Sequence, residues 1–207
     1  MGVIENVVYR LQYLRARRTG VLPWEGEREP WPLAMEVARS WHRKLTVLEV
    51  GCGSGLDAVA LAREGHEVTG LDYVEDALRM TRERARAAAV EVRTVRSDVG
   101  SYRPGVQFDL VHDSGCLHTF GPRERNQYRD RLFEWLAPGG DFVLTHFLTR
   151  HALDRWPVGP RRRSVASLER LFARELLLVE LRTEDLPVRL AAGLRVRLGH
   201  LHFRRKG

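Results

Sequence analysis

The sequence is poor in cysteine and has no long apolar run. Its two cysteines, Cys52 and Cys116, are too few for a disulfide framework or a metal cluster. No apolar stretch approaches the roughly 20 residues needed to cross a bilayer. The N-terminus mixes apolar and basic residues and lacks the continuous apolar core of a secretory signal. We therefore expect a cytoplasmic protein without a bound metal and without a membrane contact.

Lysine is also nearly absent, although the formal net charge is +7. Arginine supplies almost all of the positive charge and is scattered, with one tight cluster at Arg161–Arg163. A solvated surface explains this scatter, while contact with an anionic substrate or RNA is the alternative. No RNA-binding module is recognisable. We therefore expect a small-molecule acceptor rather than nucleic acid, and the oligomeric state stays open.

Strands and helices are predicted to alternate through most of the 207 residues. This alternation is typical of an α/β fold with a doubly wound, mostly parallel sheet. Residues 1–44 are expected to form an N-terminal helical segment, and residues 45–207 the main domain. The predicted strands are 45–50, 66–71, 91–96, 108–112, 141–147, 176–183 and 194–203, and the main predicted helices are 32–42, 55–64, 74–89 and 122–136.

A glycine-rich turn joins the first of these strands to a helix. The run Glu49-Val50-Gly51-Cys52-Gly53-Ser54-Gly55 has the spacing G-x-G-x-G, with an acidic residue two positions before it. Glycines permit a tight turn and let backbone N–H groups approach a ligand. Leu56 stands where the dinucleotide fingerprint requires a further glycine, which disfavours a nicotinamide cofactor. A tight turn without a ligand remains the alternative.

Polar residues follow the next strands. Asp72 ends the second strand, where a carboxylate can accept both hydroxyl hydrogens of a ribose or cap the following helix. Ser97-Asp98-Val99 follows the third strand, where a short polar side chain can meet an adenine amino group. Asp113 ends the fourth strand, at the edge where open α/β sheets bind ligands. The pattern predicts an adenosine-containing cofactor.

These motifs resemble the class I methyltransferases in order and spacing, including the Pro138-Gly139-Gly140 turn before the fifth strand. The resemblance covers about residues 45–147 and implies a seven-stranded sheet whose last strand is antiparallel. It also implies S-adenosyl-L-methionine as the cofactor, bound above the first, second and fourth strands. The cofactor-binding residues expected from it are Glu49, Gly51, Cys52, Gly53, Gly55, Asp57, Asp72, Tyr73, Ser97, Asp98, Val99, Asp113 and Trp24.

A narrower resemblance concerns the thiopurine, tellurite-resistance and thiol/halide branch of the class. It is carried by Pro23-Trp24-Glu25, by Gly55-Leu56-Asp57-Ala58, and by Asp113-Ser114-Gly115-Cys116-Leu117-His118 with Arg123–Tyr128 after it. The branch implies an N-terminal segment, here with Trp24, that covers the cofactor. It also implies a soft acceptor atom, namely sulfur, selenium, tellurium or a halide. The basic end of the chain from Arg161 onward matches nothing in that branch.

Two histidines are the candidate catalytic residues. His118 follows the fourth strand and is predicted to act as an acid/base or to orient the acceptor, and His146 ends the fifth strand and is the second candidate. Either histidine has a purely structural alternative. Cys116 is expected to be a wall residue, since methyl transfer needs no covalent intermediate. Tyr9 and Tyr13 share one helix face and either cap the acceptor pocket or pack in the core.

Other functions stay open beside methyl transfer to a soft atom. They are O- or N-methylation in specialised metabolism, RNA methylation, and cofactor binding by a regulator without turnover. Methylation of an exocyclic base amine is disfavoured, because Asp113-Ser114-Gly115-Cys116 stands where those enzymes resemble one another in an Asn/Asp-Pro-Pro-aromatic motif.

Overall fold

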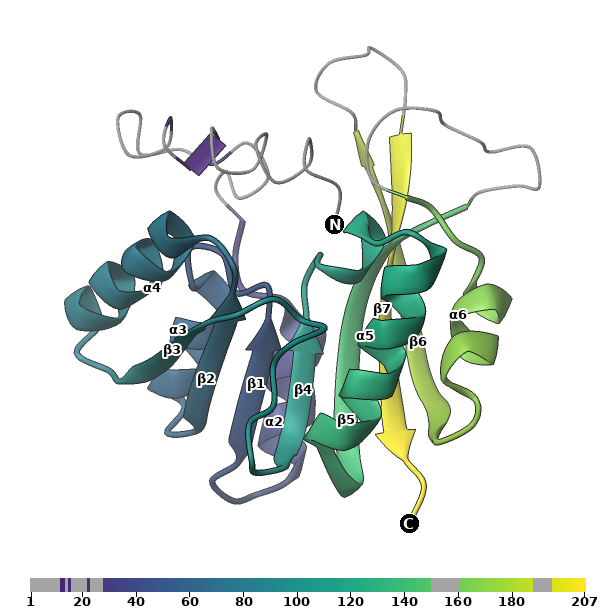
Figure 1. Ribbon diagram of the computed structural model, residues 1–207, viewed down its shortest axis with the longest axis horizontal. Coiled ribbons are helices and arrows are strands. Elements are labelled where there is room, and N and C mark those ends of the chain that lie inside the picture. Colours follow the sequence, from purple (N-terminus) through teal and green to yellow (C-terminus); the bar gives the residue numbers. More distant parts are fainter. Residues whose placement is uncertain (1–11, 14, 16–21, 23–27, 150–160, 188–194) are drawn as a thin grey trace. The chain divides into compact units, whose positions relative to one another are not determined.

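The computed structural model describes residues 12, 13, 15, 22, 28–149, 161–187 and 195–207. The described strands have the order β3-β2-β1-β4-β5-β7-β6 in one seven-stranded sheet (Figure 1). The chain divides into two compact units, a first unit of residues 1–103 and a second unit of residues 104–207. In the described part of the chain, every helix is too short or too polar to cross a membrane.

The first unit contains three parallel strands and the helices between them. β1 pairs with β2 from Thr46 opposite Glu67, and β2 pairs with β3 from Val68 opposite Val92. Parallel strands need crossover connections, which α3 and α4 supply. The elements are α2 (Pro32–Ser40), β1 (Thr46–Val50), α3 (Leu56–Arg63), β2 (Glu67–Asp72), α4 (Glu75–Ala87) and β3 (Val92–Arg96).

Local sequence explains where these helices begin. Pro32 opens α2 at the first turn, where its missing N–H costs nothing. Gly55 precedes α3 in the left-handed conformation, with φ of 78°. α4 carries Glu75 and Asp76 in its first turn and arginines in its last turn, in agreement with the helix dipole. The predicted boundaries of these helices are confirmed to within two residues.

The second unit contains four strands, of which only the last in the sequence is antiparallel. β4 and β5 are parallel, whereas β7 runs antiparallel to both β5 and β6. The predicted antiparallel last strand is therefore confirmed. The elements are β4 (Phe108–Asp113), the 3-10 helix η1 (Leu117–Thr119), α5 (Pro122–Trp135), β5 (Leu136–Leu148), α6 (Val165–Phe172), β6 (Leu176–Pro187) and β7 (Arg195–Arg205).

Aromatic rings form the core of the second unit. Phe142 of β5 and Phe203 of β7 are stacked at 6.0 Å, and Phe172 of α6 contacts both edgewise at 5.3 and 5.4 Å. Tyr128 and Trp135 of α5 are fully buried beside them. These contacts hold α5 and α6 against one face of the sheet (Figure 1).

The predicted start of the fifth strand differs from the observed one. β5 begins at Leu136, so the Pro138-Gly139-Gly140 segment, predicted as a turn before the strand, lies within its bounds. Gly139 has φ of 71°, and a side chain at Gly140 would lie 2.9 Å from the carbonyl oxygen of Asp109. The two glycines therefore permit a close backbone approach to β4, where the register shifts between Phe108 and Leu110.

Candidate functional site

The glycine loop of the first unit is bound to its neighbours by backbone hydrogen bonds. Gly51, Gly53 and Gly55 all have positive φ, between 58° and 78°. The N–H groups of residues 51 and 52 donate to the carbonyl oxygen of Leu71, at 2.8 and 3.0 Å. The Thr81 hydroxyl donates to the carbonyl oxygen of Gly53 at 2.9 Å. The loop is therefore held between β2 and α4 in a conformation that favours glycine.

Asp72 ends β2 directly beside this loop. Its carboxylate accepts hydrogen bonds from the N–H of Gly53 at 3.0 Å and of Val74 at 2.9 Å. Burial raises the pKa of Asp72 to about 6, while these backbone donors oppose the shift. A carboxylate has about four acceptor positions, so capacity remains for hydroxyl donors of a ligand. Both predicted roles of Asp72, the helix cap and the ribose acceptor, are compatible with this geometry.

The segment after β3 lies beside Asp72. The N–H of Ser97 donates to the backbone oxygen of Asp72 at 3.1 Å, which aligns the ends of β2 and β3. Asp98 is exposed, and its Oδ1 accepts from the N–H of Gly100 at 2.8 Å. Val99 and Tyr73 are half-buried in the same region. Ser97 and Asp98 thus lie directly after β3, beside the carboxyl end of β2.

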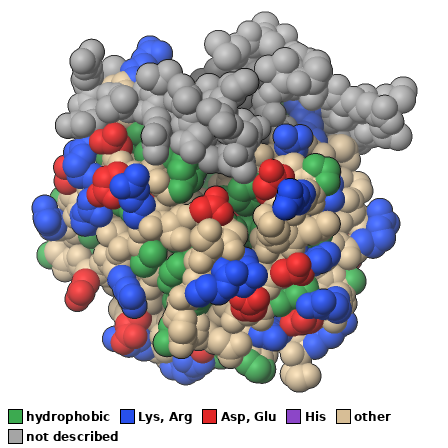
Figure 2. All heavy atoms as spheres, in the orientation of Figure 1, with side chains coloured by type: hydrophobic (Ala, Val, Ile, Leu, Met, Phe, Trp, Pro, Cys, Tyr) green, Lys and Arg blue, Asp and Glu red, His purple; other side chains and the backbone are tan. Residues whose placement is uncertain are grey.

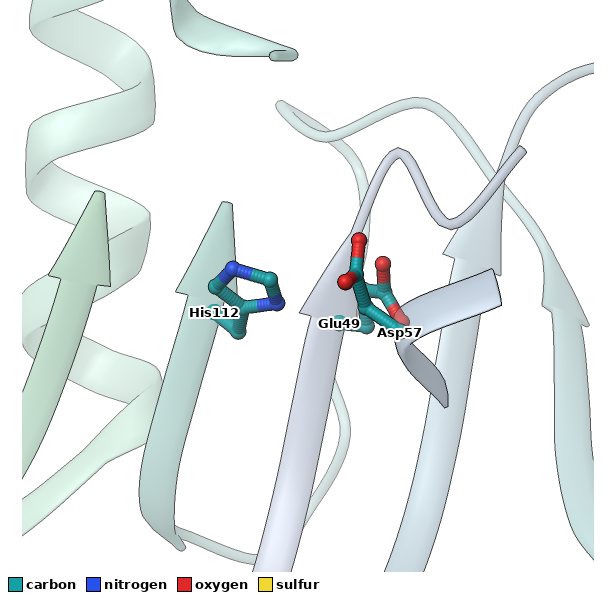
Figure 3. Close-up of side chains that lie close together, drawn as sticks. All are labelled: Glu49, Asp57 and His112. Atoms are coloured by element: carbon teal, nitrogen blue, oxygen red, sulfur yellow. The ribbon is translucent and has the colours of Figure 1, made fainter. Parts of the chain in front are cut away.

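Glu49 and Asp57 are two buried acids of the first unit (Figure 3). Their carboxylate oxygens lie within 4.8 Å of one another. Asp57 is paired with Arg28 through two hydrogen bonds, of 2.7 and 3.3 Å, and also accepts from the N–H of Trp31 at 2.9 Å. Arg28 lies over the Trp31 ring at 4.5 Å. Asp57 therefore binds residues 28–31 to the start of α3.

Sequence reasoning missed Arg28, because its partner is 29 residues away and no motif connects the two. The structure also places other residues of the first unit that the sequence analysis singled out. Cys52 is buried 3.7 Å from the Thr81 hydroxyl, and burial raises the pKa of its thiol well above the ordinary value. Tyr13 is buried, with its hydroxyl 3.0 Å from where a side chain at Gly53 would begin. Trp24 and Tyr9 lie outside the described residues.

In the second unit, Asp113 organises the loop after β4. Its carboxylate accepts hydrogen bonds from the N–H groups of Gly115, Cys116 and Leu117, at 2.8, 2.6 and 3.0 Å. The buried Tyr128 hydroxyl also favours the charged form of this carboxylate, an influence that sequence reasoning missed. Burial raises the pKa of Asp113 while these donors oppose the shift. Three acceptor positions of the carboxylate are used by the backbone that follows β4, so Asp113 holds the loop that carries His118.

His118 and His146 lie together in the second unit. Their ring centroids are 6.1 Å apart, and His118 also meets Phe147 edgewise at 5.0 Å. His146 Nδ1 lies 2.8 Å from the carbonyl oxygen of Phe147, so Nδ1 is the protonated nitrogen and Nε2 the acceptor. Among the described residues, neither His118 Nδ1 nor His146 Nε2 has a hydrogen-bond partner, and both atoms are buried.

Both histidines are neutral at physiological pH. Burial, together with the neighbouring His146 ring, lowers the pKa of His118 to about 3. Burial also lowers the pKa of His146 to about 4, against the opposing hydrogen bond to Phe147. The two rings are therefore polar, aromatic and weakly basic. His112, the third side chain drawn in Figure 3, is buried on β4 of this unit.

The arginine cluster passes beside these histidines. The N–H of Arg161 donates to the backbone oxygen of His118 at 3.2 Å, and that of Arg163 to the oxygen of Phe147 at 3.1 Å. Arg163 also forms an isolated bridge with Leu148. The backbone of 161–163 thus connects the loop of His118 with the end of β5, which its composition alone did not predict.

Comparison with known proteins agrees with this geometry. Residues 47–140 match the family described as "Methyltransferase domain". The chain is 32% identical over 136 residues to thiocyanate methyltransferase 1 of Brassica oleracea, covering 64% of this chain and 60% of that protein. It is 28% identical over 133 residues to the probable thiol methyltransferase 2 of Arabidopsis thaliana, covering 60% of this chain and 59% of that protein. The chain therefore spans about three fifths of the length of these relatives.

Solved structures show the same fold. The 1,6-didemethyltoxoflavin-N1-methyltransferase of Burkholderia thailandensis superposes with a TM-score of 0.75 at 24% identity, covering 98% of this chain and 89% of that one. TehB of Haemophilus influenzae gives a TM-score of 0.70 at 15% identity, covering 94% of this chain and 67% of that one. At such identities the likeness concerns the fold alone.

The matched residues 47–140, the strand order and the glycine loop agree with the methyltransferase class that the sequence motifs resemble. The chain is similar to thiocyanate and thiol methyltransferases, which agrees with the branch that its motifs resemble.

Proposed function

We propose that this chain transfers a methyl group from S-adenosylmethionine to a soft nucleophilic atom of a small molecule, with sulfur as the first choice. The observation that carries this proposal is the pair of buried, neutral histidines beside Phe147 in the second unit. The names of the thiocyanate and thiol methyltransferase relatives support the same acceptor chemistry.

The first unit fits the cofactor. Its glycine loop offers backbone without side chains, and Asp72 offers remaining acceptor capacity for ribose hydroxyls. Ser97, Asp98 and Val99 are assigned to the adenine side, and the buried acids Glu49 and Asp57 lie next to the loop. When bound, the cofactor supplies an activated methyl group. The residues of this unit then orient it and exclude water.

The second unit fits an acceptor that needs no strong base. A hydroxyl or amine must lose a proton during methylation, and an effective general base has a pKa near the working pH. Histidines with pKa values of about 3 and 4 are far weaker bases than that. A thiolate or another soft anion needs no proton removed within the site, and aromatic edges suit polarisable sulfur. We therefore assign His118 and His146 to orienting the acceptor.

The test is S-adenosylhomocysteine production by the purified protein with matched acceptors. An alkyl thiol, the alcohol and the amine of the same carbon frame, thiocyanate, and RNA form the panel. We expect product with the thiol or thiocyanate, and none with the alcohol, amine or RNA. Turnover confined to the alcohol or amine would overturn the soft acceptor. Calorimetric binding of S-adenosylhomocysteine without turnover on any acceptor would favour a binding protein instead.

A further inference from the structure

The strand β6 is the end of the sheet in the described part of the chain. It is 12 residues long, pairs with β7 along one side, and has no described strand along the other. An edge strand presents unpaired backbone N–H and C=O groups, which can template pairing with another strand. The backbone of this edge can therefore form hydrogen bonds with a strand of another chain.

Three large apolar side chains of β6 are exposed. The exposed fractions are 57% for Leu177, 55% for Val179 and 39% for Leu181. Among the described residues, the one other large apolar side chain with such exposure is Val106, in the loop before β4. Single exposed apolar residues are normal, whereas a run of them along one strand indicates a contact surface.

These side chains reach both faces of the strand. Leu177 is opposite Arg204 of β7, and Leu181 is opposite Leu201. Successive residues of a strand point to opposite faces, so even and odd positions of β7 mark different faces. The change of face along β6 follows from the register shift between Leu178 and Glu180. A helix or sheet packed on one face would cover only part of this set, whereas a strand added at the edge borders both faces.

The charges on β6 are complementary to those of a second copy. Glu180 and Arg182 flank Leu181, and within one chain they are bonded at 2.6 Å with both side chains about 40% exposed. In an antiparallel pair centred on Leu181, Glu180 of each copy lies opposite Arg182 of the other. Charges on an edge strand ordinarily prevent such pairing, but here the signs match in both cross-strand positions.

We propose that β6 pairs antiparallel with β6 of a second copy of this chain, centred on Leu181. The pairing joins the backbone groups of the two edges and encloses Val179 and Leu181 of both copies. Two Glu180–Arg182 pairs border this apolar centre. The interface goes beyond the proposed methyl transfer and does not depend on it.

The first test is the mass of the full chain in solution, measured by light scattering and sedimentation equilibrium. A dimer of twice 23.8 kDa is expected. Val179→Lys should raise the dimer dissociation constant by about tenfold or more, because it places two ammonium groups in the apolar centre. Val106→Lys adds the same charge at an equally exposed site and should leave the dimer intact. A monomeric parent chain at high micromolar concentration overturns the proposal.

The second test addresses the register. Arg182→Glu places like charges opposite each other and should dissociate the dimer, and the double variant Glu180→Arg/Arg182→Glu should restore it. Leu181→Cys should form a disulfide between copies under mild oxidation, because residue 181 lies opposite itself. Val106→Cys is the control and should form none. A dimer that persists in Val179→Lys and gives no cross-link at Leu181→Cys uses another surface, and the proposal is then wrong.

Discussion

The two compact units use their buried polar side chains differently. In the first unit, Asp72 joins the glycine loop to the start of α4 and keeps capacity for further donors. In the second unit, the carboxylate of Asp113 is used by the backbone of its own loop. His118 and His146 are neutral there, with buried nitrogens that have no partner among the described residues.

This contrast separates two ways of building a site. In the proposed function, the first unit positions the cofactor with backbone geometry, which needs particular residues at particular spacings. In the same proposal, the second unit positions the acceptor with two histidines whose chemistry is changed by burial, without any motif. A substitution in one unit should therefore change the property of that unit alone, and a substitution that changes both properties would contradict this contrast.

The largest effect is expected at the glycine loop. Gly55→Ala should lower the free energy of unfolding by about 3 kcal/mol, because the new methyl group would lie 2.6 Å from Thr81 in a left-handed conformation. Gly65→Ala is the matched control, since Gly65 also has positive φ but has no atom within 4 Å of the added carbon. It should cost about 1 kcal/mol. Equal losses in denaturant titrations would show that packing against Thr81 contributes nothing.

Asp113→Asn should lower the free energy of unfolding by about 2–3 kcal/mol, because one amide oxygen replaces a carboxylate that accepts three backbone N–H groups. We expect affinity for S-adenosylhomocysteine to change little in the folded variant. Unfolding curves and calorimetry measure the two quantities. A folded variant that loses cofactor affinity alone would return Asp113 to the cofactor site.

Asp72→Asn should change mainly the affinity for the cofactor, in contrast with Asp113→Asn. The loss of charge-assisted hydrogen bonds to ribose hydroxyls should weaken S-adenosylhomocysteine binding by about 2 kcal/mol, or roughly 30-fold. Asp98→Asn, at an exposed position, is the comparison and should have a smaller effect. Calorimetry at neutral pH is the measurement. Unchanged affinity in folded Asp72→Asn would remove this carboxylate from the site.

The raised pKa of Asp72 predicts a pH dependence of cofactor binding. Ribose hydroxyls donate to the carboxylate form, so affinity should fall as the pH drops below about 6, by about tenfold at pH 5. The same group does not destabilise the fold on acidification. Since its folded pKa is above the unfolded value near 3.9, its contribution to stability rises as the pH falls from 6 toward 3.9. Asp72→Asn should abolish the pH dependence of cofactor binding. If that dependence persists in the variant, another titratable group causes it.

The smallest change is expected at His118. His118→Gln should lower kcat/KM for the acceptor by about tenfold and leave S-adenosylhomocysteine affinity intact, because the ring orients the acceptor without removing a proton. At saturating cofactor, the parent activity should be flat between about pH 5 and 8 once thiol ionisation is corrected, since the histidine pKa values lie below that range. An activity that falls with a pKa near 6.5 would make His118 or His146 a general base.

Much of the fold was predictable because its signals are local. The run from Glu49 to Gly55 requires left-handed glycines, and the structure has positive φ at 51, 53 and 55. The apolar patterns of the strands and helices predicted the order of the elements along the chain, and most of their bounds to within a few residues. β5 was the exception, because a proline-glycine segment ordinarily ends a strand, and here it permits a close approach to β4 that depends on tertiary contact.

The amino-acid sequence was enough to predict the order of helices and strands along the chain, the glycine loop, and the carboxylate of Asp72 at the end of β2. These features follow from steric limits and spacing, which act over a few residues. Tertiary structure alone decided the pairing of Arg28 with Asp57, the use of Asp113 by its own loop, and the neutral state of His118 and His146. Those properties depend on burial and on partners distant in the chain, because the energy of a charge is set by the surroundings that the fold creates.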